Sequence, residues 1–193
     1  QRGNRRQAVF FREDDYRTYL RFLHEESQRW ELEVWAYCLM TNHVHLIVEP
    51  TTEQSLARGL GEVHRRYTRM VNFREGWRGY LWQGRFASVP LDELHLYAAV
   101  RYVERNPVEA RLVRQASDYP WSSAKARVMH HPDPVLAECF LTERIPNWAE
   151  FLAQPEESAT LERLNGHLRT GRPLGDPAFL TRLEQQLGRS LQK

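Results

Sequence analysis

The sequence predicts an α+β fold, in which helices pack on a ferredoxin-like antiparallel sheet and a helical extension follows. Two observations lead to this prediction. Segments with helical and strand periodicity alternate up to Val113, and after about residue 147 the patterns are helical only. The chain has 193 residues, 41% hydrophobic and 27% charged, which is the composition of a globular protein.

The first expected elements are a helix and a hairpin. Asp14 and Asp15 precede an apolar pattern of helical spacing and begin a helix that ends near Arg29. Residues 31–40 are rich in Val, Trp and Tyr, and residues 43–49 repeat the strand pattern. The two residues between them can form a tight turn, so the pair is predicted to be a β-hairpin.

Three further elements complete the expected domain. Apolar residues at helical spacing predict a helix over residues 55–74, residues 81–89 predict a short strand, and residues 91–106 predict another helix. Pro107 is expected to end this helix, because the residue before a proline disfavours helical geometry. A ferredoxin-like order needs one more strand at the front, and residues 1–10 are expected to be its end and the following loop.

The chain is expected to divide into two parts. Residues 1–125 would form the α+β domain, with its first strand incomplete. Residues 126–193 would form a helical extension, with helices around 147–154, 157–169 and 177–190 separated by Pro and Gly.

Positive charge gathers in one segment, although the net charge of the chain is only +2. Between Ser55 and Pro90 there are seven arginines and two glutamates, a local balance of +5. Tyr67, Trp77, Tyr80, Trp82 and Phe86 are interleaved with these arginines. Arginine binds phosphate in a fork and aromatic rings stack on bases, so the segment favours single-stranded nucleic acid. A solvated helix face is the alternative interpretation.

Two histidines form a candidate metal site. His43 and His45 are two residues apart on an expected strand, so both imidazoles point to the same face. Imidazole is the commonest nitrogen ligand of divalent metals. The pattern alone is weak, because two polar residues on a solvent-facing strand look the same.

A tyrosine and an asparagine could lie beside these two histidines. Tyr102 and Asn106 are four residues apart near the end of an expected helix, so they share a face. An amide oxygen there could complete a His-His-Asn metal site and bring the tyrosine hydroxyl beside it. Taken singly, the tyrosine could be a core residue and the asparagine a helix end.

These residues resemble two motifs of one family. Residues 40–48 (MTNHVHLIV) resemble the His-hydrophobic-His motif of the insertion-sequence-200-like single-tyrosine transposases, and residues 101–108 (RYVERNPV) resemble their tyrosine motif. The chain is similar, more specifically, to the REP-associated tyrosine transposases, which act on repetitive extragenic palindromes. Residues 2–4, 81–86 and 118–123 match further stretches of that pattern.

The resemblance covers roughly residues 1–125 and implies an enzyme. It implies cleavage and strand transfer of single-stranded or hairpin DNA through a 5′-phosphotyrosine. Tyr102 is the implied nucleophile, and His43, His45 and Asn106 are the implied ligands of Mg²⁺ or Mn²⁺. Thr41 stands where family members commonly have proline.

The resemblance also places the DNA on the basic segment. The helix over residues 55–74 and the loop after it would hold the hairpin and its flank. The residues expected to contact DNA are Arg58, Arg65, Arg66, Arg69, Trp82 and Arg85.

Several alternatives stay open from the sequence. Tyr67 in the basic helix is a rival nucleophile, ranked lower because Val71, and not Asn or Gln, lies four residues later. A non-catalytic protein that binds single-stranded DNA or RNA hairpins is the alternative function, and a small metallohydrolase is a further one. His130 and His131 lie in a proline-rich loop and are interpreted as structural or incidental.

The protein is expected to be located in the cytoplasm. No apolar run approaches the ~20 residues needed to span a bilayer, and no signal peptide is visible. The two cysteines form no motif, as is usual for a reduced compartment. The protein is expected to act as a monomer or a homodimer.

Overall fold

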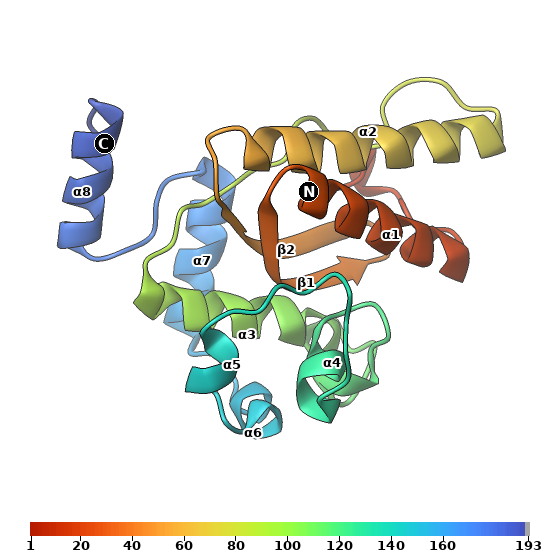
Figure 1. The fold of residues 1–193 in the computed structure, drawn as a ribbon. Helices are drawn as coiled ribbons and strands as arrows, with labels where there is room; N and C mark the ends of the chain where they lie inside the picture. The colour runs from red at the N-terminus through yellow and green to blue at the C-terminus, as the bar shows by residue number, and fades with distance from the viewer. Residues whose placement is uncertain (192–193) are drawn as a thin grey trace. The chain divides into compact units, whose positions relative to one another are not determined.

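The computed structural model describes residues 1–191 and has the predicted α+β fold (Figure 1). An antiparallel hairpin is accompanied by helices, including every helix expected from the sequence. In chain order the elements are η1 (Asn4–Arg6), α1 (Glu13–Arg29), β1 (Leu32–Met40), β2 (His43–Pro50), α2 (Ser55–Glu75), α3 (Glu93–Glu109), η2 (Ala116–Asp118), α4 (Ala124–Met129), α5 (Leu141–Arg144), α6 (Trp148–Ala153), α7 (Ser158–Thr170) and α8 (Pro177–Leu187).

The chain packs as two compact units. The first contains residues 1–86 and 103–153, and the second contains residues 87–102 together with the chain from Gln154 onward. The limit between the units therefore falls inside α3, directly after Tyr102, whereas the expected division lay at residue 125.

The hairpin places the two histidines opposite the end of β1. Strands β1 and β2 are antiparallel, and their register pairs Met40 with His43 and Cys38 with His45. The two residues between the strands form the expected tight turn. Because side chains alternate along a strand, His43 and His45 lie on the same face and Val44 lies on the other.

The sheet is smaller than predicted. Within residues 1–191 it has two strands. The predictions of a strand over residues 81–89 and of a front strand were therefore wrong. Two single bridges stand in their place, one between Arg2 and His43 and one between Gly3 and Trp82. The bridges cannot extend into a ladder, because the chain leaves the extended conformation at the 3-10 helix η1, which contains left-handed residues.

Helices α1 and α2 lie side by side over one face of the hairpin (Figure 1). Their apolar stripes and that face of the strands form a core that is closed to solvent. Its fully buried members include Tyr19, Leu23, Val34, Leu39, Val44, Val63, Tyr67 and Val71.

Local interactions define where these two helices begin and end. The Asp15 carboxylate accepts the backbone N–H groups of Phe11 and Arg12, which caps the first turn of α1. The same carboxylate forms an ion pair with Arg74 near the end of α2. Gly76 follows α2 with a φ of +67°, a left-handed conformation that ends helices and that glycine adopts readily.

The C-terminal part of α3 and the residues up to Ala153 pack in the same compact unit as the hairpin. Glu104 is fully buried, and its carboxylate accepts hydrogen bonds from Ser123 Oγ at 2.5 Å and Trp148 Nε1 at 2.6 Å. Burial raises the pKa of Glu104 to about 7, against the effect of these two donors. The residue therefore links α3 to α6 and to the loop before α4.

The prediction that Pro107 ends helix α3 is wrong, because the helix continues to Glu109. A proline lacks only its own N–H, and the turn that follows supplies its own hydrogen bonds. Ala110 donates to the Asn106 carbonyl, and Leu112 donates to the Pro107 carbonyl. Asn106 therefore lies inside the last helical turn and keeps helical spacing from Tyr102.

His64 of α2 is a polar residue in the core. It is 8% exposed, and its Nε2 lies 3.0 Å from the Tyr19 hydroxyl. Burial lowers the pKa of His64 to about 3, so the imidazole is neutral in the folded protein at neutral pH.

His64 should make the folded protein sensitive to acid. Its stabilising contribution is complete above its unfolded pKa of ~6.5 and is lost as the pH falls, because only the unfolded chain then takes up the proton. Between pH 7.5 and 4.5 the unfolding free energy of the wild type should therefore fall by about 3 kcal/mol more than that of His64→Gln. Urea unfolding of both proteins at both pH values measures the difference. Equal losses in the two proteins would show that His64 is not the group that titrates.

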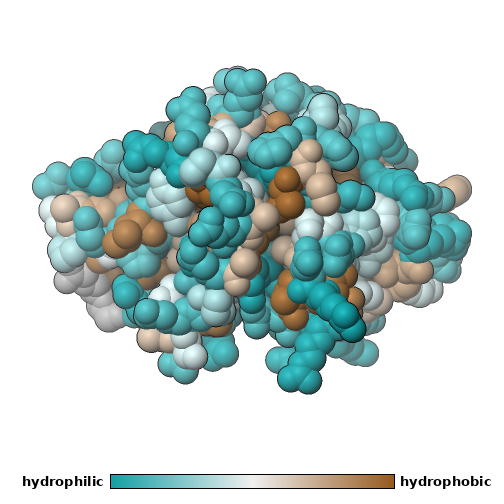
Figure 2. All heavy atoms as spheres, turned by 90° about the horizontal axis from the view of Figure 1, so that it is seen from below, coloured by the Kyte–Doolittle hydropathy of each residue, from teal (hydrophilic) through white to brown (hydrophobic). Residues whose placement is uncertain are grey.

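No helix in the described residues is long and apolar enough to cross a membrane. On the face shown in Figure 2, hydrophilic side chains predominate and apolar atoms form small, separate patches.

Candidate active site

The imidazoles of His43 and His45 lie next to each other on β2. Their ring centroids are 4.9 Å apart, and the rings are nearly perpendicular, with an interplanar angle of 89°. Strand alternation produces this arrangement, because the residue between them points into the core on the other face.

Both imidazoles are held neutral. Burial lowers the pKa of His43 to about 4, and the positive charge of Arg2 acts in the same direction. Burial lowers the pKa of His45 to about 3, with a further contribution from His43. A neutral imidazole keeps one unprotonated nitrogen, which is the form that binds a metal.

Asn106 brings an amide to the same place. Its side chain hydrogen-bonds to His43, an interaction that opposes the lowering of the His43 pKa. Among residues 1–191 no three His, Cys, Asp or Glu side chains cluster together in a way that could hold a metal ion. The Asn106 amide is the candidate for a third protein ligand here, because it hydrogen-bonds to His43. Two imidazoles and an amide oxygen fit a divalent cation such as Mn²⁺, with modest affinity expected for Mg²⁺.

Tyr102 lies four residues before Asn106 on α3. At about 100° per residue the two side chains leave the helix on the same side. Tyr102 belongs to the second unit, where its hydroxyl donates a hydrogen bond of 3.3 Å to Asn165 Oδ1 of α7. Its side chain is half-buried.

Tyr67, the rival nucleophile, is a core residue. It has no solvent exposure, and its hydroxyl donates a 2.6 Å hydrogen bond to the Val9 carbonyl. Burial raises the pKa of this phenol. A tyrosine in this environment is a poor nucleophile for an external substrate.

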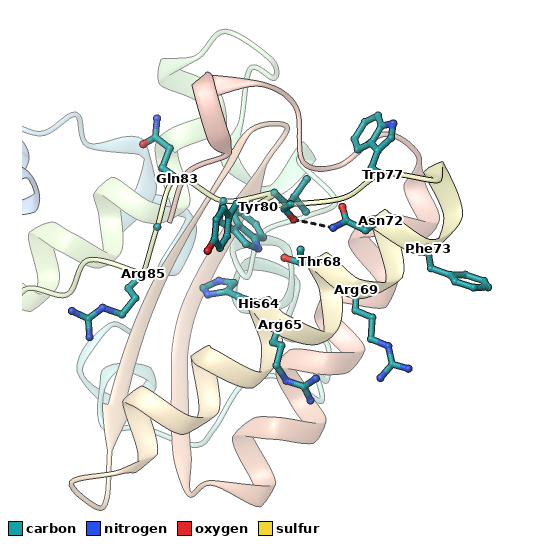
Figure 3. A pocket seen from close by; sticks show the side chains of 14 residues that line it. His64, Arg65, Thr68, Arg69, Asn72, Phe73, Trp77, Tyr80, Gln83 and Arg85 are labelled. Carbon is teal, nitrogen blue, oxygen red and sulfur yellow. Dashed lines mark hydrogen bonds between the residues drawn. The ribbon is translucent and has the colours of Figure 1, made fainter.

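Helix α2 and the loop that follows it enclose a cleft of about 940 Å³ (Figure 3). The side chains of Arg65 and Arg69 extend outward from the helix, and that of Arg85 extends outward from the loop. The aromatic residues on the lining are Phe73, Trp77, Tyr80 and Trp82. Phe73 is 90% exposed and Tyr80 is 87% exposed, so both rings are accessible for stacking.

The expected DNA contacts divide into accessible and engaged side chains. Arg69 and Arg85 are exposed on the cleft, and Arg65 is exposed but paired with Glu62 at 2.6 Å. The other three contribute to packing. Arg66 forms ion pairs of 2.6 Å with Glu25 and Glu26, and Trp82 is only 5% exposed. Arg58 is exposed, but it lies over the Trp30 ring and outside the lining of the cleft.

Phe73 lines the cleft, although it is not among the DNA contacts expected from the sequence. Phe73 follows Arg65 and Arg69 at intervals of four, so the three residues lie along one face of α2. This spacing was the available signal, but an apolar residue in an amphipathic helix is usually assigned to the core.

The sequence places the chain in the class of transposases. The family model described as Transposase IS200 like matches residues 2–106, more than half of the chain. The chain belongs to this IS200-like transposase family, which confirms the family predicted from the sequence.

A solved structure of a REP-associated tyrosine transposase bound to a REP hairpin has a similar fold. The TM-score is 0.53 at 20% sequence identity, over 70% of this chain and 80% of that chain. No curated protein matches the chain.

Proposed function

We propose that the protein cleaves single-stranded DNA beside a hairpin and transfers the strand through a 5′-phosphotyrosine on Tyr102. The observation that carries this proposal is the pair of neutral imidazoles, His43 and His45, next to the Asn106 amide. Membership of the IS200-like transposase family supports the same class of reaction.

In this proposal His43, His45 and Asn106 would hold Mg²⁺ or Mn²⁺. A cation bound there supplies positive charge that polarises the scissile phosphate and orients it for in-line attack. The protein supplies unprotonated ligands near neutral pH, because burial lowers the pKa of both imidazoles.

Tyr102 supplies the nucleophile. Its Oη forms a bond to phosphorus while the bond to the 3′ oxygen of the preceding nucleotide breaks. The phenol loses its proton, and the departing 3′ oxygen gains one. The new phosphotyrosine linkage is again a phosphodiester, so a second 3′-OH can reverse the step without another energy source.

In this proposal the cleft beside α2 would hold the DNA. Arg65, Arg69 and Arg85 line this cleft, and they would contact phosphates, which set affinity and register. The exposed rings of Phe73 and Tyr80 are placed to stack on unpaired bases.

A salt-dependence measurement tests the phosphate contacts. Each phosphate contact with a single strand contributes a slope of about −0.7 to log affinity against log salt. Arg69→Ala with Arg85→Ala should therefore flatten the slope by about 1.4 and weaken different sequences to a similar extent. Arg17→Ala on α1 is the matched control, because it removes an exposed arginine that does not line the cleft. An unchanged slope in the double variant would move the DNA path away from this cleft.

The full chain, mixed with hairpin DNA that has a single-stranded flank, tests the reaction itself. With Mn²⁺ or Mg²⁺, a strand labelled at its 3′ end should become covalently attached to the protein. The same strand labelled at its 5′ end should yield a shorter free fragment. EDTA should prevent both products. Tight DNA binding without either product in both metals would favour the non-catalytic hairpin-binding alternative.

A further inference from the structure

The turn residue before the first histidine makes two hydrogen bonds with its side-chain amide. Asn42 Nδ2 donates to the Arg6 carbonyl at 3.0 Å, and Asn42 Oδ1 lies 2.6 Å from His43 Nδ1. All three residues belong to the first compact unit. Neither the proposed metal ligands nor the proposed DNA contacts include Asn42 or Arg6.

These two bonds determine the position of a proton. A backbone carbonyl can only accept, so the NH₂ group of Asn42 has to face Arg6. The amide oxygen then faces His43, and because that oxygen also only accepts, the proton has to be on Nδ1 of the imidazole. The Arg6 carbonyl alone determines this orientation of the amide.

We infer that Asn42 is a positioning residue, which holds His43 in the Nδ1–H tautomer and presents its Nε2 lone pair as the ligating nitrogen. A neutral imidazole has a single lone pair, so fixing the proton on one nitrogen fixes the metal-binding atom as the other. Histidine ligands commonly donate their second N–H to an acceptor that fixes the ring and its tautomer. This inference rests on the proposed metal-binding role of His43.

The backbone at this place makes the arrangement rigid. The Asn42 carbonyl accepts from the Gly3 N–H at 2.8 Å, so the turn is tied to the N-terminal segment that carries the Arg6 carbonyl. A Cβ at Gly3 would lie 2.4 Å from the Gln7 carbonyl oxygen, so the close approach of this segment requires glycine. The amide of Asn42 is therefore held from both sides.

Two variants of Asn42 and one of its neighbour test the inference. Asn42→Ala removes the acceptor, whereas Asn42→Asp keeps an acceptor oxygen for His43. Thr41→Ala is the matched control, because it changes an exposed side chain in the same turn. Nitrogen NMR of the histidine rings in the metal-free protein reports the tautomer, and titration with Mn²⁺ reports the affinity.

The expected result is a selective effect of Asn42→Ala. His43 should lose its preference for the Nδ1–H tautomer, and Mn²⁺ affinity should fall about 10- to 100-fold. Thr41→Ala should match the wild type in both measurements, and Asn42→Asp should keep the wild-type tautomer. An unchanged tautomer in Asn42→Ala would overturn the inference.

The two readouts separate this inference from the proposed function. If Asn42→Ala does not fold, the tautomer in Asn42→Asp still decides, because a shift to Nε2–H there would overturn the inference. If the wild type binds no Mn²⁺, the proposed metal site fails, and the part of the inference that concerns metal presentation fails with it. A normal metal affinity with no covalent DNA product would reject the proposed reaction and leave the role of Asn42 supported.

Discussion

Tyr102→Phe should abolish the covalent protein–DNA product, a fall of at least about a thousandfold. The substitution removes the only atom of this side chain that can attack phosphorus. The same change removes a single hydroxyl, and its hydrogen bond to Asn165 is a long one of 3.3 Å, so folding should be little affected. Hairpin affinity should stay within about twofold, because the proposed phosphate contacts lie on α2 and the loop after it. A gel assay with 3′-labelled DNA measures the product, and a binding titration measures the affinity.

Tyr67→Phe is the control for this prediction. It removes a buried hydroxyl that donates to the Val9 carbonyl, so it should cost about 1–3 kcal/mol of stability. At a temperature where the variant remains folded, it should still form the covalent product. Adducts from the Tyr102 variant, together with their loss in the Tyr67 variant, would reverse the assignment of the nucleophile.

The hairpin and the helices were predictable because each has a local signal. Alternation along residues 31–40 and 43–49 predicted two strands, and the same alternation brings His43 and His45 to one face with ring centroids 4.9 Å apart. The helical spacing in α3 likewise places Tyr102 and Asn106 on the same side of one helix.

The prediction of a strand over residues 81–89 was wrong for a reason that a local sequence pattern cannot reveal. A strand exists only when a neighbour pairs with it over several residues. Here the neighbour is the N-terminal segment, which turns away at residues 4–6 after two single bridges. The length of such pairing depends on the partner and not on the segment that is predicted.

The arginines show what composition does and does not determine. The excess of arginine between residues 55 and 90 predicted a basic surface, and Arg69 and Arg85 do lie exposed on a cleft. Arg66 instead forms ion pairs with Glu25 and Glu26, which come from another helix. Long-range partners of this kind have no signal in the local sequence, so charge alone could not separate a phosphate contact from a structural ion pair.

The double variant His43→Ala and His45→Ala should lose detectable Mn²⁺ binding and reduce the covalent product at least about a hundredfold. The substitutions remove both nitrogen ligands, and an asparagine amide alone is too weak a ligand to retain a divalent cation. Calorimetric titration with Mn²⁺ measures the binding, and the labelled-hairpin assay measures the product. Folding should survive, because both imidazoles lie on the face of β2 opposite the helical core.

The matched control for this loss is a second pair of histidines. His130 and His131 are adjacent and exposed, and His130 has a left-handed φ of 52°, which asparagine tolerates better than alanine. His130→Asn with His131→Ala therefore removes two imidazoles without straining the backbone, and it should bind Mn²⁺ as the wild type does. If the His43 and His45 double variant kept full Mn²⁺ affinity, the cation would have to bind elsewhere in the protein. If the double variant lost Mn²⁺ affinity but still formed the covalent product, in EDTA as well, the attack by the tyrosine would need neither the metal nor the two imidazoles.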